Sequence, residues 1–286
     1  MNSENIFAKQ IDSPDTSEGQ LEKLKPVEPN LEDKYAINQF NDYLEDELRA
    51  LNLSFSPVAP ESIKIYRRDD FEKIKPDAVA REALLAAGIC FGQNQEIIIK
   101  RTTSSEQYHD LLHGMIKHFL ADRNLQQTGG AISQNENATT GFANGIAENL
   151  AVEILNKHRS ELLANLPSLS INSSRAQMAK SNFFRNISAE GAFVNSLIKR
   201  GAFKGGSDPE KLWQSLKQEF LRGGLENCRE IENIFGTGSL KILAKRGQGA
   251  DIDSLVYRYF MSDDEIERDR IKEKLQTPAP AVRQAA

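Results

Sequence analysis

Two histidines with metal-binding spacing stand in the segment QYHDLLHGMIKHF, residues 107–119. His109 and His113 are four positions apart, and residues with that spacing lie on the same face of a helix. Two neutral imidazoles placed in this way can share one Zn²⁺ at about 2.0–2.1 Å each. The pair therefore predicts a zinc site. The alternative is two half-exposed histidines on a helix surface.

A third ligand is expected from another helix, because His118 is nine residues beyond His109 and about half a helical turn out of phase with it. Glu148 follows His113 by 35 residues, within GIAENLAVEIL. It lies at the flank of the apolar side of that segment, where a free carboxylate is costly. We predict Glu148 as the third ligand. The alternatives are a surface glutamate at this position and Glu153, which points about 140° away from Glu148.

Strands are predicted before the histidine segment. Residues 62–68 alternate between polar and apolar, which is typical of a short strand. Residues 89–101, ICFGQNQEIIIKR, predict a hairpin with Gly92 and Asn94 in its turn. A capping box at Thr103–Glu106 then begins the helix that carries the histidines.

Helices are predicted over most of the remaining chain. Apolar residues at steps of three or four indicate an amphipathic helix over residues 31–53: Ile37, Phe40, Leu44, Leu48 and Leu51. Further helices are predicted over residues 69–74, 76–88 and 142–158, with a connection over residues 126–141. The later part of the chain is expected to be helical, with glycines such as Gly201 ending its helices.

Composition and patterning divide the chain into four predicted parts. Residues 1–30 and 273–286 are polar and contain prolines, so they are expected to form a disordered arm and a disordered tail. Residues 31–158 would hold the sheet and the metal-bearing helices, and residues 159–272 would form a helical C-terminal half.

The bulk properties exclude several classes of partner. A net charge of -5 gives no basic footprint for nucleic acid. No apolar run approaches the roughly 18 residues of a membrane helix, and the N-terminus has no apolar signal segment. The only two cysteines, Cys90 and Cys228, make no disulfide framework. We therefore expect a cytoplasmic protein with no membrane or nucleic-acid partner. Non-classical export stays open, and the oligomeric state is not indicated.

The order of these motifs resembles the gluzincin metallopeptidases, above all the small minigluzincins. The resemblance runs from about Ile63 to about Gly247 and includes HDLLH, the hairpin AAGICFGQNQEIIIKR, and the segments DPEKLWQSLKQEF and IENIFGTGS. It implies an α+β, zincin-like fold, with a small twisted sheet packed on metal-bearing helices and a mainly helical C-terminal half. It also implies zinc-dependent hydrolysis of peptide bonds in a peptide or protein substrate.

The resemblance also implies roles for single residues. His109, His113 and Glu148 match the zinc ligands of the family, and Asp110 stands where the family has its catalytic glutamate. In that role a carboxylate takes a proton from the attacking water and passes it to the leaving amine. Residues 96–101, EIIIKR, would be the edge strand that holds an extended substrate.

The chain departs from the family pattern where HExxH becomes HDxxH. Aspartate is shorter by one C–C bond of about 1.5 Å, and a displacement of about 1 Å in a catalytic group can cost on the order of 10²-fold in rate. The alternative function is therefore a catalytically impaired zinc-binding relative that acts as a peptide- or protein-binding module.

Val152 stands where the family often has an acidic residue beside a ligand histidine. For the oxyanion, Tyr257 and Tyr259 are candidates, whereas Phe183–Phe184 stand where a tyrosine was expected; aromatic core is the alternative for all four.

Two other metal-site classes fit less well. An HD-type phosphohydrolase needs a histidine upstream of the His-Asp pair, and no histidine precedes His109. A di-iron carboxylate bundle could use the ExxH formed by Glu106 and His109, but it needs a second ExxH. Neither His118 nor His158 has a glutamate three residues before it.

Overall fold

The computed structural model describes residues 25–67, 89–91, 96–101, 104–128, 136–171 and 188–276. The chain divides into two compact units, and each is described by itself. The first comprises Met1–Asn124 and Leu150–Ser188, and the second Leu125–Asn149 and Ala189–Ala286. Two of the boundaries between the units lie inside helices.

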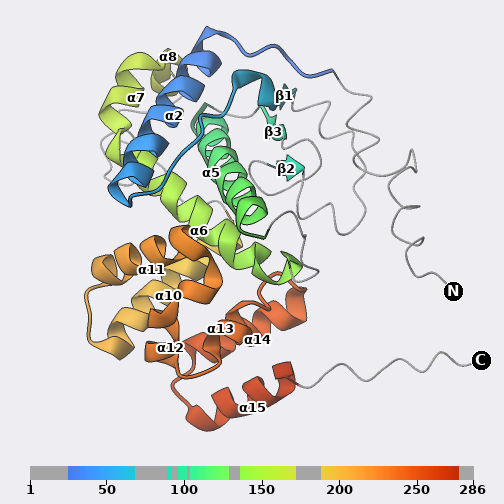
Figure 1. The fold of residues 1–286 in the computed structure, drawn as a ribbon, viewed down its shortest axis with the longest axis vertical. Coiled ribbons are helices and arrows are strands. Elements are labelled where there is room, and N and C mark those ends of the chain that lie inside the picture. The colour runs from blue at the N-terminus through green and yellow to red at the C-terminus, as the bar shows by residue number, and fades with distance from the viewer. Residues whose placement is uncertain are drawn as a thin grey trace, which may run out of the picture. The chain divides into compact units, whose positions relative to one another are not determined.

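The first unit combines a small sheet with helices, and the described part of the second is helical (Figure 1). The first unit contains α2 (Leu31–Ala50), η2 (Pro60–Ser62), β1 (Ile63–Tyr66), β2 (Ile89–Phe91), β3 (Glu96–Lys100), most of α5 (Ser104–Thr128), the end of α6 (Glu136–Lys157), α7 (Arg159–Asn165) and α8 (Pro167–Ile171). The second contains the end of α5, the start of α6, α10 (Ala189–Gly205), α11 (Pro209–Gly223), η3 (Leu225–Asn227), α12 (Arg229–Phe235), α13 (Ser239–Leu243), α14 (Ala250–Met261) and α15 (Glu265–Gln276). The α+β class is thereby confirmed.

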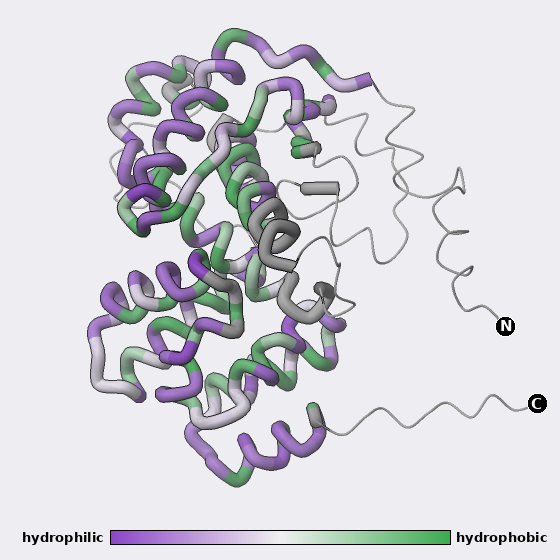
Figure 2. Tube along the Cα trace, viewed as in Figure 1, coloured by the Kyte–Doolittle hydropathy of each residue, from purple (hydrophilic) through white to green (hydrophobic). Residues whose placement is uncertain are grey.

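Helix α2 begins at a capping box. The Asn30 side chain accepts a hydrogen bond from Asp33 N (2.8 Å), and the Asp33 carboxylate accepts one from Asn30 N (2.9 Å). Apolar and polar residues alternate around this helix (Figure 2). The predicted apolar face is confirmed at Ile37, Phe40, Leu44 and Leu48, which are buried together with Ala36 and Tyr43. Leu51 differs from the prediction, because the helix ends at Ala50 and Leu51 is the half-buried residue after it.

The sheet of the first unit has the strand order β1-β3-β2. The predicted hairpin is confirmed, since β2 and β3 pair antiparallel with Cys90 opposite Ile97. The prediction that β3 is an edge strand is wrong, because β1 pairs with it in parallel on its other side, with Ile63 opposite Ile97. The predicted helices over residues 69–74 and 76–88 and the turn of the hairpin lie outside the described residues.

The N-terminal arm and the C-terminal tail are described in part. Val27 N donates to Ile65 O at 2.6 Å, which attaches the end of the predicted arm to β1. Helix α15 continues to Gln276, four residues into the predicted tail. The rest of both segments lies outside the described residues. None of the described helices is both long enough and apolar enough to span a membrane.

Asp33 joins three segments of the first unit. Its side chain is 1% exposed and accepts hydrogen bonds from Arg101 Nη2 at 2.8 Å and from Gln107 Nε2 at 2.7 Å. Arg101 follows β3 and Gln107 lies in the second turn of α5. A buried carboxylate needs such partners to offset its desolvation. Asp33 therefore fixes the start of α5 against α2 and the sheet.

We expect Asp33→Ala to lower the free energy of unfolding by about 3 kcal/mol, because breaking a buried pair leaves its partners uncompensated. Urea unfolding followed by circular dichroism measures this change. Asp46→Ala is the matched control on α2: Asp46 is 68% exposed and 3.7 Å from Arg49, so its change should stay within about 0.5 kcal/mol. Equal midpoints for the two variants would contradict the role of Asp33.

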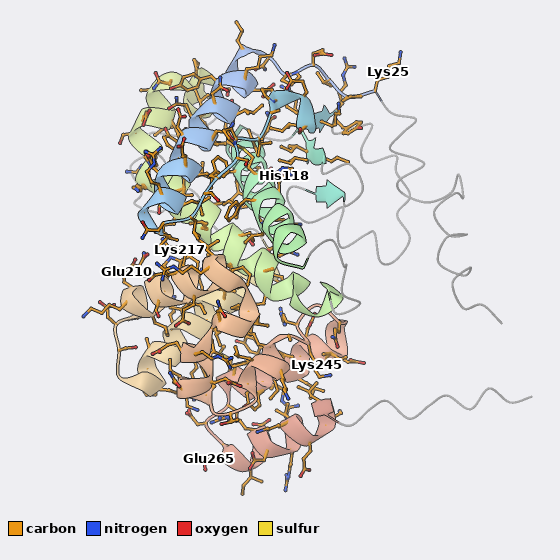
Figure 3. All side chains as sticks on the ribbon, in the orientation of Figure 1. Lys25, His118, Glu210, Lys217, Lys245 and Glu265 are labelled. Carbon is orange, nitrogen blue, oxygen red and sulfur yellow. The ribbon has the colours of Figure 1, made fainter. Side chains whose placement is uncertain are left out.

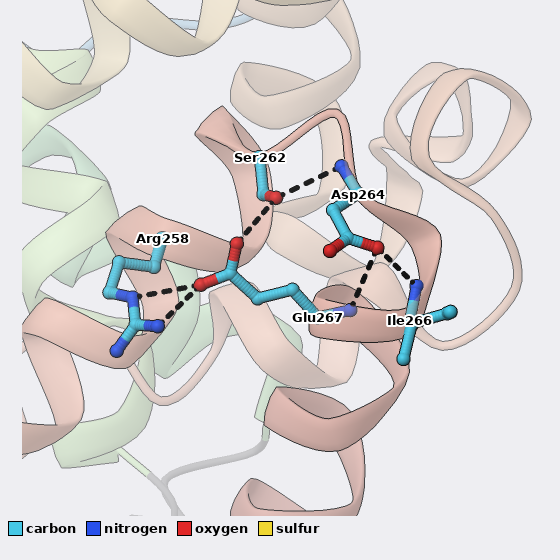
Figure 4. A network of polar contacts seen from close by, with 5 residues as sticks. All are labelled: Arg258, Ser262, Asp264, Ile266 and Glu267. Atoms are coloured by element: carbon cyan, nitrogen blue, oxygen red, sulfur yellow. Dashed lines mark hydrogen bonds and ion pairs between the residues drawn. The ribbon is translucent and has the colours of Figure 1, made fainter.

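Two features of the second unit were not apparent from the sequence. Gly201 lies inside α10 rather than at a helix end, and a Cβ there would come within 2.8 Å of Leu212 Cδ2. In Figure 4, Asp264 Oδ1 accepts hydrogen bonds from the backbone N–H groups of Ile266 and Glu267 at 2.9 and 3.3 Å, which caps the start of α15. Hydrogen bonds from Ser262 and Arg258 lower the pKa of Glu267.

Candidate metal centre

The histidine pair lies on a helix that is buried on all sides. Every residue of α5 from Gln107 to Ile116 is buried. A helix of this kind is usually apolar all round, yet this stretch includes polar and ionisable residues: Gln107 (7% exposed), His109 (2%), Asp110 (8%) and His113 (2%). The alternative of two half-exposed surface histidines is therefore wrong for this structure.

The two imidazoles are close enough to share a metal ion. The ring centroids of His109 and His113 are 5.9 Å apart, with 54° between the ring planes. Two imidazoles bound to one tetrahedral ion at about 2.1 Å per nitrogen have ring centroids about 5–6 Å apart. The pair thus fits zinc in donor type and in spacing.

Asp110 lies beside the first histidine. Its Oδ1 is 3.4 Å from Nδ1 of His109, and the two side chains are 12% and 2% exposed. Neighbouring residues on a helix rarely face each other, so this contact depends on the short aspartate side chain. The general-base candidate is therefore also in contact with a predicted ligand.

Glu148 is buried as well, at 1% exposure. It lies in α6, which is buried over residues 145–151, so the prediction that this side chain is not on the surface is confirmed. In the second unit α6 approaches α10 closely, since a Cβ at Gly145 would be only 2.6 Å from Glu190 O. Asn149 Nδ2 also donates to Gly191 O at 3.0 Å. These two contacts hold α6 against α10 within the second unit.

The four predicted site residues do not all fall in one unit. His109, Asp110 and His113 belong to the first unit, and Glu148 belongs to the second, two positions before the residue at which the first unit resumes. Over the described ranges, no three or more His, Cys, Asp or Glu side chains form a group that could hold a metal ion. The structure thus shows a metal-compatible histidine pair, and the third ligand stays a prediction.

The residues judged less suitable for the metal are also less buried. His118, labelled on α5 in Figure 3, is only partly buried, as are Val152 and Glu153 on α6. This agrees with the half-turn offset between His118 and the histidine pair. It also leaves Val152 as an apolar residue at the position where the resemblance implies an acidic one.

The candidate oxyanion residues are part of the aromatic packing of the second unit. Tyr259 is 3% exposed; its hydroxyl donates to Phe235 O at 3.3 Å and its ring lies 5.0 Å from that of Phe260. Tyr257 is 46% exposed and its ring lies 6.3 Å from that of Phe193. Phe183–Phe184 lie outside the described residues. Neither tyrosine is indicated as a catalytic group.

Sequence reasoning missed the polar residues that hold α5 in place. Besides Gln107, Tyr108 anchors the helix next to His109: its hydroxyl lies 3.2 Å from Ser168 Oγ in α8. Burial raises the pKa of Tyr108 to about 12, against an opposing effect of the Ser168 hydrogen bond. A buried glutamine and tyrosine directly before HDxxH carry no recognisable local signal, because their partners lie 60 or more residues away.

Comparisons with protein-family models, with curated proteins and with solved structures find no match for this chain.

Proposed function

We propose that this chain is a zinc-dependent peptidase in which His109, His113 and Glu148 hold the metal and Asp110 is the general base. The observation that carries the proposal is the burial of His109 and His113, one turn apart, on a helix enclosed on all sides. Imidazoles are seldom enclosed in this way unless they are paired or bind a metal. Their spacing of 5.9 Å favours metal binding.

When bound, zinc would supply Lewis acidity that polarises the scissile carbonyl and lowers the pKa of water. The imidazoles of His109 and His113 would act as neutral donors, and the Glu148 carboxylate would add one negative charge. A carboxylate oxygen of Asp110 would accept the proton that water loses as it attacks the carbonyl carbon. It would then deliver that proton to the departing amine nitrogen.

An extended substrate would pair with the sheet through β2 rather than β3. β3 is paired on both sides, whereas β2 pairs with β3 alone among the described strands. A peptide added along the outer side of β2 would gain main-chain hydrogen bonds. In this proposal the substrate would lie beside the strand that runs antiparallel to β3 in the first unit.

The alternative is a zinc-binding relative that has lost most of its activity and binds peptides or proteins. Its support is Asp110, whose short side chain lies against His109. A carboxylate engaged in that way can fail to reach an attacking water.

Metal analysis and peptide cleavage test the proposal on the purified full chain. We expect stoichiometric zinc by inductively coupled plasma mass spectrometry, and cleavage of a broad peptide library that a chelator stops and added zinc restores. Stoichiometric zinc without cleavage would favour the binding module. A chain that takes up no zinc would overturn both functions.

A further inference from the structure

We infer that Asp110 is a positioning residue that holds His109 in the tautomer with its hydrogen on Nδ1. The contact that carries the inference joins Asp110 Oδ1 and His109 Nδ1 at 3.4 Å. When the carboxylate is ionised it can only accept hydrogen bonds, and Nδ1 is then the donor. In a neutral imidazole the lone pair is then on Nε2. The inference rests on the proposed function in one respect only. If His109 binds zinc, this tautomer makes Nε2 the atom that would bind the metal.

The length of the side chain explains why aspartate suits this task. Nδ1 is the ring nitrogen nearer to the helix backbone, and the Asp110 carboxylate is also near the backbone. A glutamate at this position would carry its carboxylate one C–C bond, about 1.5 Å, farther out. The departure from HExxH therefore has a structural reason: the shorter residue reaches the ring of its neighbour.

The same contact supplies a partner that the resemblance would place elsewhere. Histidine ligands of metals almost always donate their second ring N–H to a carboxylate, a carbonyl or water. Where the resemblance implies an acidic residue for that purpose, this chain has the apolar Val152. Asp110 takes over the supporting role for His109 from within the same helix. A carboxylate has two oxygens, so a hydrogen bond from the ring to one of them does not by itself occupy both.

Nitrogen-15 NMR of the histidine rings, on the metal-free full chain at mildly alkaline pH, tests the tautomer directly. The His109 signals are assigned with a His109→Gln variant. We expect the wild type to carry the hydrogen on Nδ1 and Asp110→Ala to shift His109 towards a mixture of tautomers. Asp110→Asn, which retains an acceptor oxygen, should keep most of the Nδ1–H form. A wild-type ring with its hydrogen on Nε2, or no difference between wild type and Asp110→Ala, would overturn the inference.

Zinc titration separates this inference from the proposed function. We expect Asp110→Ala to raise the zinc Kd by about 10–100-fold, Asp110→Asn to raise it less, and Glu153→Ala on α6 to leave it unchanged. If the wild type shows the Nδ1–H tautomer but binds no zinc, the proposed function fails and the tautomer assignment stands. If it binds zinc with the hydrogen on Nε2, the assignment fails and the proposed function stands.

Discussion

Replacing His113 with alanine should abolish stoichiometric zinc binding. The reason is that His113 would supply one of only two imidazole donors, and its ring is 2% exposed and 5.9 Å from that of His109. Structural zinc in zinc-finger peptides binds with about 10–16 kcal/mol shared among four ligands, and by a similar share the loss of one donor here should weaken binding by about 10³-fold. Mass spectrometry of the metal content after dialysis against a weak chelator measures the loss.

His118→Ala is the matched control for this experiment, because His118 lies on the same helix, is partly exposed and is out of phase with the pair. It should keep its zinc. Circular dichroism of both variants shows whether the fold is retained. Full zinc occupancy in a folded His113→Ala variant would show that the metal binds elsewhere or that its binding does not require the His113 ring.

Substitutions of Asp110 should separate proton transfer from metal binding. Asp110→Asn should keep most of its zinc and lower kcat by about 10²–10⁴-fold, since an amide cannot take up the proton. Asp110→Glu should raise kcat if the native carboxylate falls short of the attacking water. Asp110→Glu should at the same time weaken zinc binding, because the carboxylate on the longer side chain would no longer contact Nδ1 of His109. Peptide cleavage and zinc titration of each variant give the two readouts.

The binding-module alternative predicts a different result for the same variants. A wild type with full zinc and no cleavage across a broad peptide library, matched by an equally inert Asp110→Glu variant, would rule out hydrolysis. The aspartate would then serve only to support His109.

Local sequence patterns predicted which helices and strands form better than they predicted how these elements pack. The period of Ile37, Phe40, Leu44 and Leu48 predicted α2 because one face of that helix packs and the other is solvated. The hairpin of β2 and β3 was equally visible, since its strands are neighbours in the chain. The central place of β3 was not, because its parallel partner β1 lies more than 30 residues earlier.

The full burial of the α5 segment that carries the histidine pair was not predicted from the sequence. The alternative of two half-exposed histidines assumed a helix at the surface, yet residues 107–116 are enclosed. Such enclosure depends on elements distant in sequence, for example on Asp33 in α2, and no local period can predict it. The spacing of the histidines was enough to propose the site residues, which stay a prediction, whereas the contact between Asp110 and His109 could not be predicted from spacing.

The bonds of Asp33 also bear on how fast the first unit folds. They join residues 68 and 74 positions apart, and closing a loop of that length costs roughly 4 kcal/mol of chain entropy. Contacts of such long range are expected to form late, after α2 and the local hairpin. In stopped-flow measurements, Asp33→Ala should then accelerate unfolding and leave the refolding rate almost unchanged. The helix that carries the histidines would thus be fixed in position only in the final step, and the histidine pair would be among the last parts of the unit to become ordered.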